Sequence, residues 1–114
     1  MSNDYFQFKD FIIYQNISNV KITTDSILIG YWICQDKHYS YLDIGTGTGI
    51  IALLIASKNI QARIDAIEIN SDNYQQALLN FQNSKFADRL IAINNSLQNY
   101  TTHRKYDAIV SNPP

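Results

Sequence analysis

The spacing of apolar residues changes along the chain and divides it into two kinds of segment. Residues 6–14 begin with alternating apolar and polar side chains and continue with a run of β-forming residues. Residues 16–19 have the composition of a turn, and residues 20–22 resemble a second short strand. Thr23–Asp25 then offers N-cap side chains to a helix over residues 26–32. This pattern predicts a hairpin-like arm that leads into a helix.

The pattern after residue 40 is an alternation of strands and helices. In the helix expected over residues 50–58, apolar side chains lie on nearly every side of the helix. In the helix expected after a capping Ser71, they recur at spacings of three and four residues. Alternating strands and helices predict right-handed crossovers and a parallel sheet. The predicted strands are residues 41–44, 63–69, 89–93 and 106–110, and the predicted helices are residues 50–58 and 71–81.

These elements predict an α/β chain with a Rossmann-like arrangement. We expect residues 1–40 to form an N-terminal arm and capping helix, and residues 41–114 to form the Rossmann-like domain. A length of 114 residues, with 46% hydrophobic and 17% charged residues, fits one small globular domain.

Charge and composition exclude several classes of protein. The net charge of −1 predicts no basic face of the kind that binds nucleic acid non-specifically. The longest apolar stretch, residues 49–56, is too short to span a membrane. His38 and His103 lack metal-ligand spacing, so no metal site is expected. A single cysteine and the absence of a secretory signal favour a cytoplasmic protein, while oligomeric state cannot be read from the sequence.

The strongest chemical signal is the segment Asp43-Ile44-Gly45-Thr46-Gly47-Thr48-Gly49. A glycine loop between a strand and a helix lets backbone N–H groups approach a ligand closely. The third glycine comes one residue too early for the dinucleotide fingerprint. With Asp43 two positions before the first glycine, the loop suits S-adenosylmethionine, whose ammonium the carboxylate would attract while loop amides face its carboxylate. The alternative is a tight turn in which Asp43 only bonds the loop backbone.

Polar residues at the ends of the next two strands fit the same ligand. Glu68 ends the second strand, where a carboxylate can accept both ribose hydroxyls of an adenosine. Its alternative role is a favourable charge near the next helix N-terminus. Asn95 or Ser96, after the third strand, could accept the adenine amine, although Asn is equally common as a loop former.

The last strand is followed by Asn112-Pro113-Pro114. The Asn112 side-chain oxygen and the Pro113 carbonyl would form two rigid acceptors for an NH₂ group. Hydrogen bonds to these two acceptors would direct the nitrogen lone pair toward an incoming methyl group. The transfer would then need no strong general base.

Taken together, residues 41–114 resemble the class I S-adenosylmethionine-dependent methyltransferases that act on adenine N6 or glutamine N5. The segments 6–11, 21–32 and 84–86 resemble those of the bacterial tRNA(Val) adenine N6-methyltransferases, which modify the adenine next to the anticodon. The resemblance implies S-adenosylmethionine as cofactor, tRNA as substrate and Asn112, Pro113 and Pro114 as the catalytic grip on the target amine. The candidate cofactor residues are Thr24, Asp25, Asp43, Gly45, Thr46, Gly47, Gly49, Glu68, Ile69, Asn95 and Ser96.

Three features depart from that family. The family carries an aromatic residue after Asn-Pro-Pro, and further strands follow, whereas this sequence ends at Pro114. Phe86 stands where the family has Trp, and Asn95-Ser96 where it is often acidic. We therefore expect the C-terminal strands to be missing and these 114 residues alone to transfer no methyl group. Alternative functions are glutamine N5-methylation of release factors and cofactor binding without activity.

Overall fold

The computed structural model describes residues 4–113 and places four of their strands in one parallel sheet. The strand order is β5-β4-β3-β6, so β3 is central and β6 forms an edge. The strand bounds are Ser40–Ile44 for β3, Arg63–Glu68 for β4, Leu90–Asn94 for β5 and Ala108–Ser111 for β6. The predicted α/β architecture with a parallel sheet is confirmed, with ends displaced from prediction by one or two residues.

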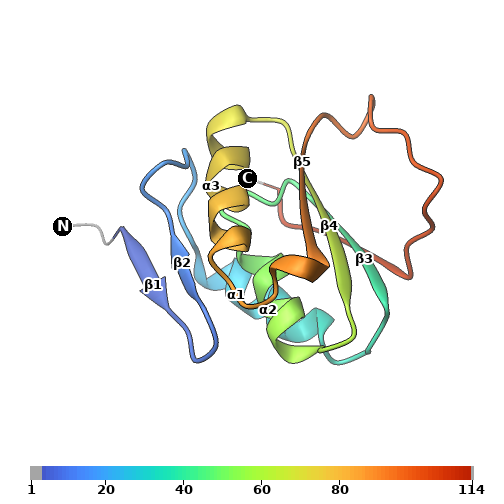
Figure 1. The fold of residues 1–114 in the computed structure, drawn as a ribbon, viewed down its shortest axis with the longest axis horizontal. Helices are drawn as coiled ribbons and strands as arrows, with labels where there is room; N and C mark the ends of the chain where they lie inside the picture. Colours follow the sequence, from blue (N-terminus) through green and yellow to red (C-terminus); the bar gives the residue numbers. More distant parts are fainter. Residues whose placement is uncertain (1–3, 114) are drawn as a thin grey trace.

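The helices cover one face of this sheet. They are α1 (Thr24–Ile33), α2 (Ile50–Lys58) and α3 (Ser71–Gln82), and the short 3-10 helix η1 (Ala87–Arg89) precedes β5. Figure 1 shows the three α-helices on one side of the sheet and the long segment between β5 and β6 on the other. The two faces of the sheet therefore have different coverings.

Helix α2 is buried on all sides, as its apolar sequence predicts. Residues 50–56 are all buried because α2 packs between the sheet and α1. The approach to α1 is close: a Cβ atom on Gly30 would lie 2.6 Å from Leu54 Cδ1. Glycine is therefore favoured at this crossing, since any side chain there would require Leu54 to shift.

The arm begins with an antiparallel hairpin of β1 (Tyr5–Gln7) and β2 (Ile12–Tyr14). The predicted strand at residues 20–22 is wrong. Side chains satisfy the polar backbone there: the Val20 carbonyl accepts a hydrogen bond from Ser18 Oγ at 2.6 Å, and the Ile22 N–H donates to Gln15 Oε1 at 3.0 Å. This segment consequently crosses the molecule without joining a ladder.

The arm shares its core with the sheet and helices. Phe11 and Ile13, from the hairpin, lie in one apolar cluster with Tyr41, Leu53 and Phe81. The division of the chain at residue 40 stays a prediction about domain organisation.

The predicted N-cap of α1 is confirmed, and the predicted N-cap of α3 is wrong. Thr23 caps α1, where its Oγ1 accepts a hydrogen bond from the Ser26 N–H at 3.2 Å. Ser71 does not cap α3; it is the first helical residue, and the cap is Asn70, whose Oδ1 accepts from the Asn73 N–H at 2.9 Å. Both side chains serve the exposed N–H groups of a first turn.

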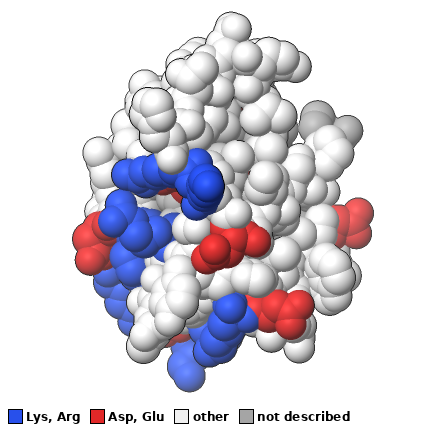
Figure 2. Space-filling view, turned by 90° about the vertical axis from the view of Figure 1, so that its right-hand side faces the viewer, with Lys and Arg blue, Asp and Glu red and all other residues white. Residues whose placement is uncertain are grey.

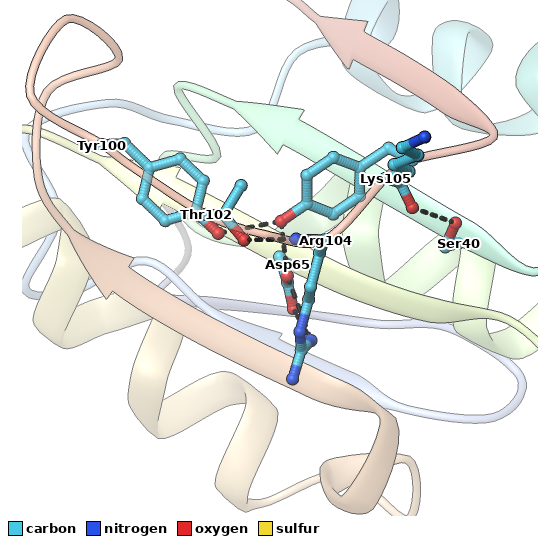
Figure 3. Close-up of polar contacts among 7 residues, drawn as sticks. Ser40, Asp65, Tyr100, Thr102, Arg104 and Lys105 are labelled. Atoms are coloured by element: carbon cyan, nitrogen blue, oxygen red, sulfur yellow. Dashed lines mark hydrogen bonds and ion pairs between the residues drawn. The ribbon is translucent and has the colours of Figure 1, made fainter.

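A buried carboxylate anchors the segment between β5 and β6 to the face of the sheet opposite the helices. Asp65 on β4 accepts hydrogen bonds from Arg104 Nη1 at 3.1 and 3.2 Å and from the Tyr106 hydroxyl at 2.6 Å (Figure 3). The Tyr100 and Tyr106 hydroxyl oxygens are 2.8 Å apart, so Tyr100 extends the network. Burial and the bond to Asp65 raise the pKa of the Tyr106 hydroxyl.

Replacing Arg104 with Met is expected to destabilise the protein by roughly 1–2 kcal/mol, because it leaves a buried carboxylate short of donors. The value lies at the low end for buried pairs since half of the Arg104 side chain is exposed. Urea denaturation measures it. Lys105→Met is the control, because Lys105 makes no ion pair within residues 4–113. Equal stability of the two variants would contradict the assigned role of Arg104.

Candidate functional site

The carboxyl ends of the parallel strands bring together groups that are far apart in the sequence. The glycine loop, residues 45–49, follows β3, Glu68 ends β4 and Asn112 follows β6. Because β3 lies between β4 and β6, the loop is flanked by the strands that carry Glu68 and Asn112. The chain proceeds from β3 to β4 on one side and returns to β6 on the other, and ligands of open α/β sheets bind at such a change of direction.

Backbone geometry explains the glycines of the loop. Gly45, Gly47 and Gly49 have φ angles of 72°, 59° and 92°, which favour glycine. A Cβ atom would also lie 2.9 Å from Val20 Cγ2 at Gly47 and 2.6 Å from Phe81 Cε1 at Gly49. At Gly45, no atom of residues 4–113 other than those of Gly45 and its two chain neighbours lies within 4 Å of such a Cβ position. Gly47 and Gly49 are thus required by packing, whereas the surface of Gly45 is open to a ligand.

Glu68 fixes the loop and keeps acceptor capacity. The residue is buried, its Oε1 accepts a hydrogen bond from the Gly47 N–H at 2.8 Å, and its Oε2 accepts from the Asn70 N–H at 3.0 Å. A carboxylate has about four lone-pair positions. Glu68 can therefore hold the loop and the start of α3 and still accept two hydroxyl groups.

Asp43 has a polar atom that the protein leaves unsatisfied. The side chain is 1% exposed, and Oδ2 accepts a hydrogen bond from Thr46 Oγ1 at 2.7 Å. Oδ1 has no hydrogen-bond partner among the described residues. The pKa of Asp43 is raised to about 6, mainly because the side chain is buried; the hydrogen bond from Thr46 lowers it and the charge of Glu68 raises it. A buried acceptor without a donor is costly, so the site favours a cationic donor.

The loop amides are engaged within the protein. The N–H groups of Gly45 and Thr46 donate to the Ile67 carbonyl at 2.9 and 3.1 Å, and the Gly49 N–H donates to the Thr46 carbonyl at 2.9 Å. Because the Gly47 N–H is held by Glu68, these four groups do not face outward for a ligand carboxylate. The exposed part of the loop is Gly45, which follows the end of β3, where the Asp43 carboxylate is buried.

The variant Asp43→Asn is expected to stabilise the protein by roughly 1–3 kcal/mol at pH 7.5, since it removes a buried charge. The folded protein holds the Asp43 proton up to about pH 6, whereas the unfolded chain releases it near 3.8. The destabilisation by Asp43 is therefore absent below about pH 4, grows as the pH rises to 6 and is constant above it. Urea denaturation of both proteins at pH 7.5 and 4.5 measures the difference. A gain of the same size at both values would contradict this account of Asp43.

The predicted acceptor residues follow the edge strand. Ser111 ends β6, and its hydroxyl donates to the Ile44 carbonyl at 3.1 Å, which ties this end of β6 to the residue before the glycine loop. Asn112 is half-buried and Pro113 is exposed. Pro114 lies outside the described residues. Asn112 thus follows directly on a strand end that is fixed beside the loop.

The other predicted cofactor residues are not drawn together in the same way. Ile69 is 71% exposed just after β4. Asn95 and Ser96 are used within their own turn: Asn95 Oδ1 accepts from the Ser96 N–H at 2.8 Å, and Ser96 Oγ accepts from the Asn99 N–H at 3.2 Å. Thr24 and Asp25 are exposed at the start of α1. Their roles toward a cofactor stay predictions.

Side-chain amides that support the site were missed by the sequence analysis. Asn94 Nδ2 donates to the Glu68 carbonyl at 2.8 Å, so the end of β5 holds the end of β4. Asn73, Gln76 and Asn80 form a buried polar face on α3. Their spacings of three and four were the available signal, but polar residues on a helix ordinarily indicate an exposed face.

Charged side chains on the face beside the β5–β6 segment are mixed in sign. Figure 2 shows basic side chains gathered on part of this face with acidic ones among them. Arg63, Arg104 and Lys105 line a hollow of about 310 Å³ there, together with Asp65 and Tyr106. Residues 4–113 contain no group of three His, Cys, Asp or Glu side chains that could hold a metal ion. No helix in that range is long and apolar enough to cross a membrane.

Comparison with known proteins relates this arrangement to methyl-transferring enzymes. Residues 20–114 match the family described as Methyltransferase small domain. A tRNA1(Val) (adenine(37)-N6)-methyltransferase from Parabacteroides distasonis is 44% identical over 116 residues, which is 100% of this chain and 48% of that protein. The enzyme of the same description from Cytophaga hutchinsonii is 45% identical over 117 residues, covering 100% and 49%. The chain thus spans about half the length of these curated relatives.

Solved structures share the fold at low sequence identity. The structure of P. horikoshii TYW2 in complex with MeSAdo matches with a TM-score of 0.79 and 17% identity, over 96% of this chain and 43% of that one. A putative caffeoyl-CoA O-methyltransferase from Staphylococcus aureus matches with a TM-score of 0.67 and 23% identity, over 82% and 46%. These matches establish the class I methyltransferase fold.

Proposed function

Since the chain belongs to the Methyltransferase small domain family, we propose that it binds S-adenosylmethionine and transfers its methyl group to N6 of an adenine in tRNA(Val), next to the anticodon. The observation that carries the proposal is the carboxyl edge of the sheet. There Asp43, whose Oδ1 has no partner among the described residues, and the open Gly45 surface lie at the end of β3. On one side of β3 is β4, which ends at Glu68, and on the other is β6, which leads into Asn112.

The residues at this edge fit each part of the cofactor. The Asp43 carboxylate would pair with the ammonium of its amino-acid part, which supplies the missing donor to Oδ1. Glu68 would accept the ribose hydroxyls through its remaining lone pairs. Gly45 allows close contact without a side chain. The cofactor supplies an electrophilic methyl group at a sulfonium centre.

Asn112 and Pro113 would hold the acceptor nitrogen. Two oxygen acceptors on an exocyclic NH₂ group align its hydrogens and direct its lone pair away from them. The amine is neutral at the start and becomes cationic after methylation, so its proton can leave to water without a strong base in the site. The chain's contribution is therefore positioning and the charge complement around the cofactor.

The choice of tRNA over a protein glutamine rests on the relatives. An amide NH₂ presents the same two hydrogens as an adenine amine, so the Asn112 grip alone does not separate the two acceptors. Both relatives described above are named for tRNA1(Val) adenine-37, and the similarity includes the arm as well as the sheet. With a tRNA substrate, we also propose a cytoplasmic location.

The test is methyl transfer by the full-length gene product from radiolabelled S-adenosylmethionine. We expect label in a tRNA(Val) transcript, no label in the same transcript with guanine at position 37, and no label in a release factor. Label in the release factor alone would replace the proposal with glutamine methylation. Tight cofactor binding with label in neither acceptor would reduce it to a cofactor-binding function.

A further inference from the structure

The buried amide side chains of α3 connect the N-terminal arm with the cofactor loop. Asn73, Gln76 and Asn80 lie on one face of the helix and are 6%, 1% and 0% exposed. Fully buried amides in a small domain are uncommon, because each must find partners for two N–H donors and an oxygen. Here the partners are backbone groups from two segments that are distant in sequence.

Gln76 and Asn73 hold only the arm through their side-chain oxygens. Gln76 Oε1 accepts hydrogen bonds from the N–H groups of Ile17 at 2.6 Å and Ser18 at 3.3 Å. Asn73 Oδ1 accepts from the Asn19 N–H at 2.7 Å. These bonds give the irregular segment after β2 the backbone partners that a strand ladder would otherwise supply.

Asn80 differs because it bonds both the arm and the glycine loop. Its Oδ1 accepts from the Tyr14 N–H at 2.8 Å, and its Nδ2 donates to the Tyr14 carbonyl at 2.8 Å. The same Nδ2 donates to the Thr48 carbonyl at 2.8 Å. The next residue on α3, Phe81, closes the space beside Gly49. Asn80 and Phe81 therefore contact the end of the glycine loop from one side. Asn80 also bonds β2.

A second connection reaches the other cofactor element. Asn19 Nδ2 donates to Asn70 Oδ1 at 3.3 Å, and the Asn70 N–H donates to Glu68 Oε2 at 3.0 Å. Val20 Cγ2 lies against Gly47, within 2.9 Å of where a Cβ would stand. The arm thus contacts the glycine loop directly and is connected to Glu68 through Asn70. Displacement of residues 14–20 is therefore expected to disturb both the loop and Glu68.

We propose that Asn80 is a positioning residue that couples the order of the arm to cofactor binding. Through its bond to the Thr48 carbonyl it sets the loop that carries Gly45, and through Tyr14 it sets the arm. A ligand that fixes the loop then stabilises the arm through the same side chain, and an ordered arm in turn favours ligand binding, because such coupling is reciprocal. The proposal rests on the proposed cofactor, and its test separates the two.

The first measurement is the Kd of S-adenosylhomocysteine, determined by titration calorimetry for the wild type, Asn80→Ala and Gln76→Ala. Gln76→Ala is the matched control because Gln76 also holds two arm N–H groups but makes no bond to the loop. We expect about tenfold weaker binding for Asn80→Ala, which corresponds to about 1.4 kcal/mol. A clearly smaller weakening is expected for Gln76→Ala at a comparable loss of stability, because that change loosens the arm alone. Equal effects of the two variants on the Kd would overturn the proposal.

The second measurement needs no variant and decides the matter if Asn80→Ala does not fold. Hydrogen exchange of the wild-type protein is followed with and without S-adenosylhomocysteine. Slower exchange in residues 14–19 upon binding supports the coupling, and unchanged exchange there overturns it. If the wild type binds no S-adenosylhomocysteine, the proposed function fails and the coupling fails with it. Binding without any response of the arm removes the coupling alone.

Discussion

The variant Asn112→Ala of the full-length gene product is expected to transfer the methyl group roughly 100- to 1,000-fold more slowly than the wild type, as when one positioned hydrogen-bonding group is removed from a reacting centre. Asn112 follows β6, whose last residue is bonded to Ile44 immediately before the glycine loop. In the proposed mechanism its amide oxygen is the acceptor that orients the target amine. Single-turnover transfer to tRNA(Val) measures the rate, and titration calorimetry measures cofactor affinity, which is expected to stay within about twofold of the wild type.

Two further variants, one at residue 112 and one at residue 111, test whether the Asn112 amide oxygen orients the target amine. Asn112→Asp keeps an acceptor at the same place and is expected to retain more activity than Asn112→Ala. Ser111→Ala removes a hydroxyl whose one bond within residues 4–113 is to the Ile44 carbonyl. This change is expected to alter the rate by less than about tenfold. Wild-type turnover by Asn112→Ala would mean that the acceptor amine is held elsewhere.

The variant Glu68→Ala is expected to weaken S-adenosylhomocysteine binding by roughly 1–3 kcal/mol, about 10- to 100-fold, because it removes the acceptor for the ribose hydroxyls. The same change frees the Gly47 and Asn70 N–H groups, so part of the loss comes from a less ordered loop. Titration calorimetry at pH 7.5 gives the Kd for both proteins.

A ligand that lacks one hydroxyl separates these contributions. The 2′-deoxy analogue of S-adenosylhomocysteine is expected to bind the wild type more weakly than the parent ligand, whereas Glu68→Ala binds both about equally. If removal of the hydroxyl weakened binding to the same degree in both proteins, Glu68 would be a structural anchor of the loop without contact to the ribose.

Local sequence patterns predicted those parts of the fold that depend on local interactions. The continuous apolar run 50–56 identified α2 because a helix between a sheet and another helix is buried all round. The glycine loop could also be predicted from the sequence, since its positive φ angles restrict the residue type at Gly45, Gly47 and Gly49.

The errors arose where tertiary contacts replaced local preference. Residues 20–22 contain β-forming side chains, but their backbone groups bond Gln15 and Ser18 in place of a neighbouring strand. Asn73, Gln76 and Asn80 resemble an exposed helix face, and only the position of the arm reveals that they are buried. The engagement of the loop amides likewise depends on Glu68 and Ile67, which follow them by about twenty residues.

The network around Asp65 was missed for a related reason. Asp65 lies within an otherwise apolar strand and reads as an interruption of the pattern. Its partners Arg104 and Tyr106 come from a segment without regular structure. Nothing in the spacing of these residues indicates that they meet, since irregular segments have no period that fixes which side chains face the sheet.

We propose that this protein forms N6-methyladenosine in tRNA(Val) through Asn112. Nucleoside mass spectrometry of tRNA(Val), purified from cells in which the gene is deleted and from cells complemented with wild type or with Asn112→Ala, tests it most directly. N6-methyladenosine next to the anticodon is expected to be lost on deletion, restored by the wild type and not restored by the variant. An unchanged amount of N6-methyladenosine in the deletion strain would contradict it.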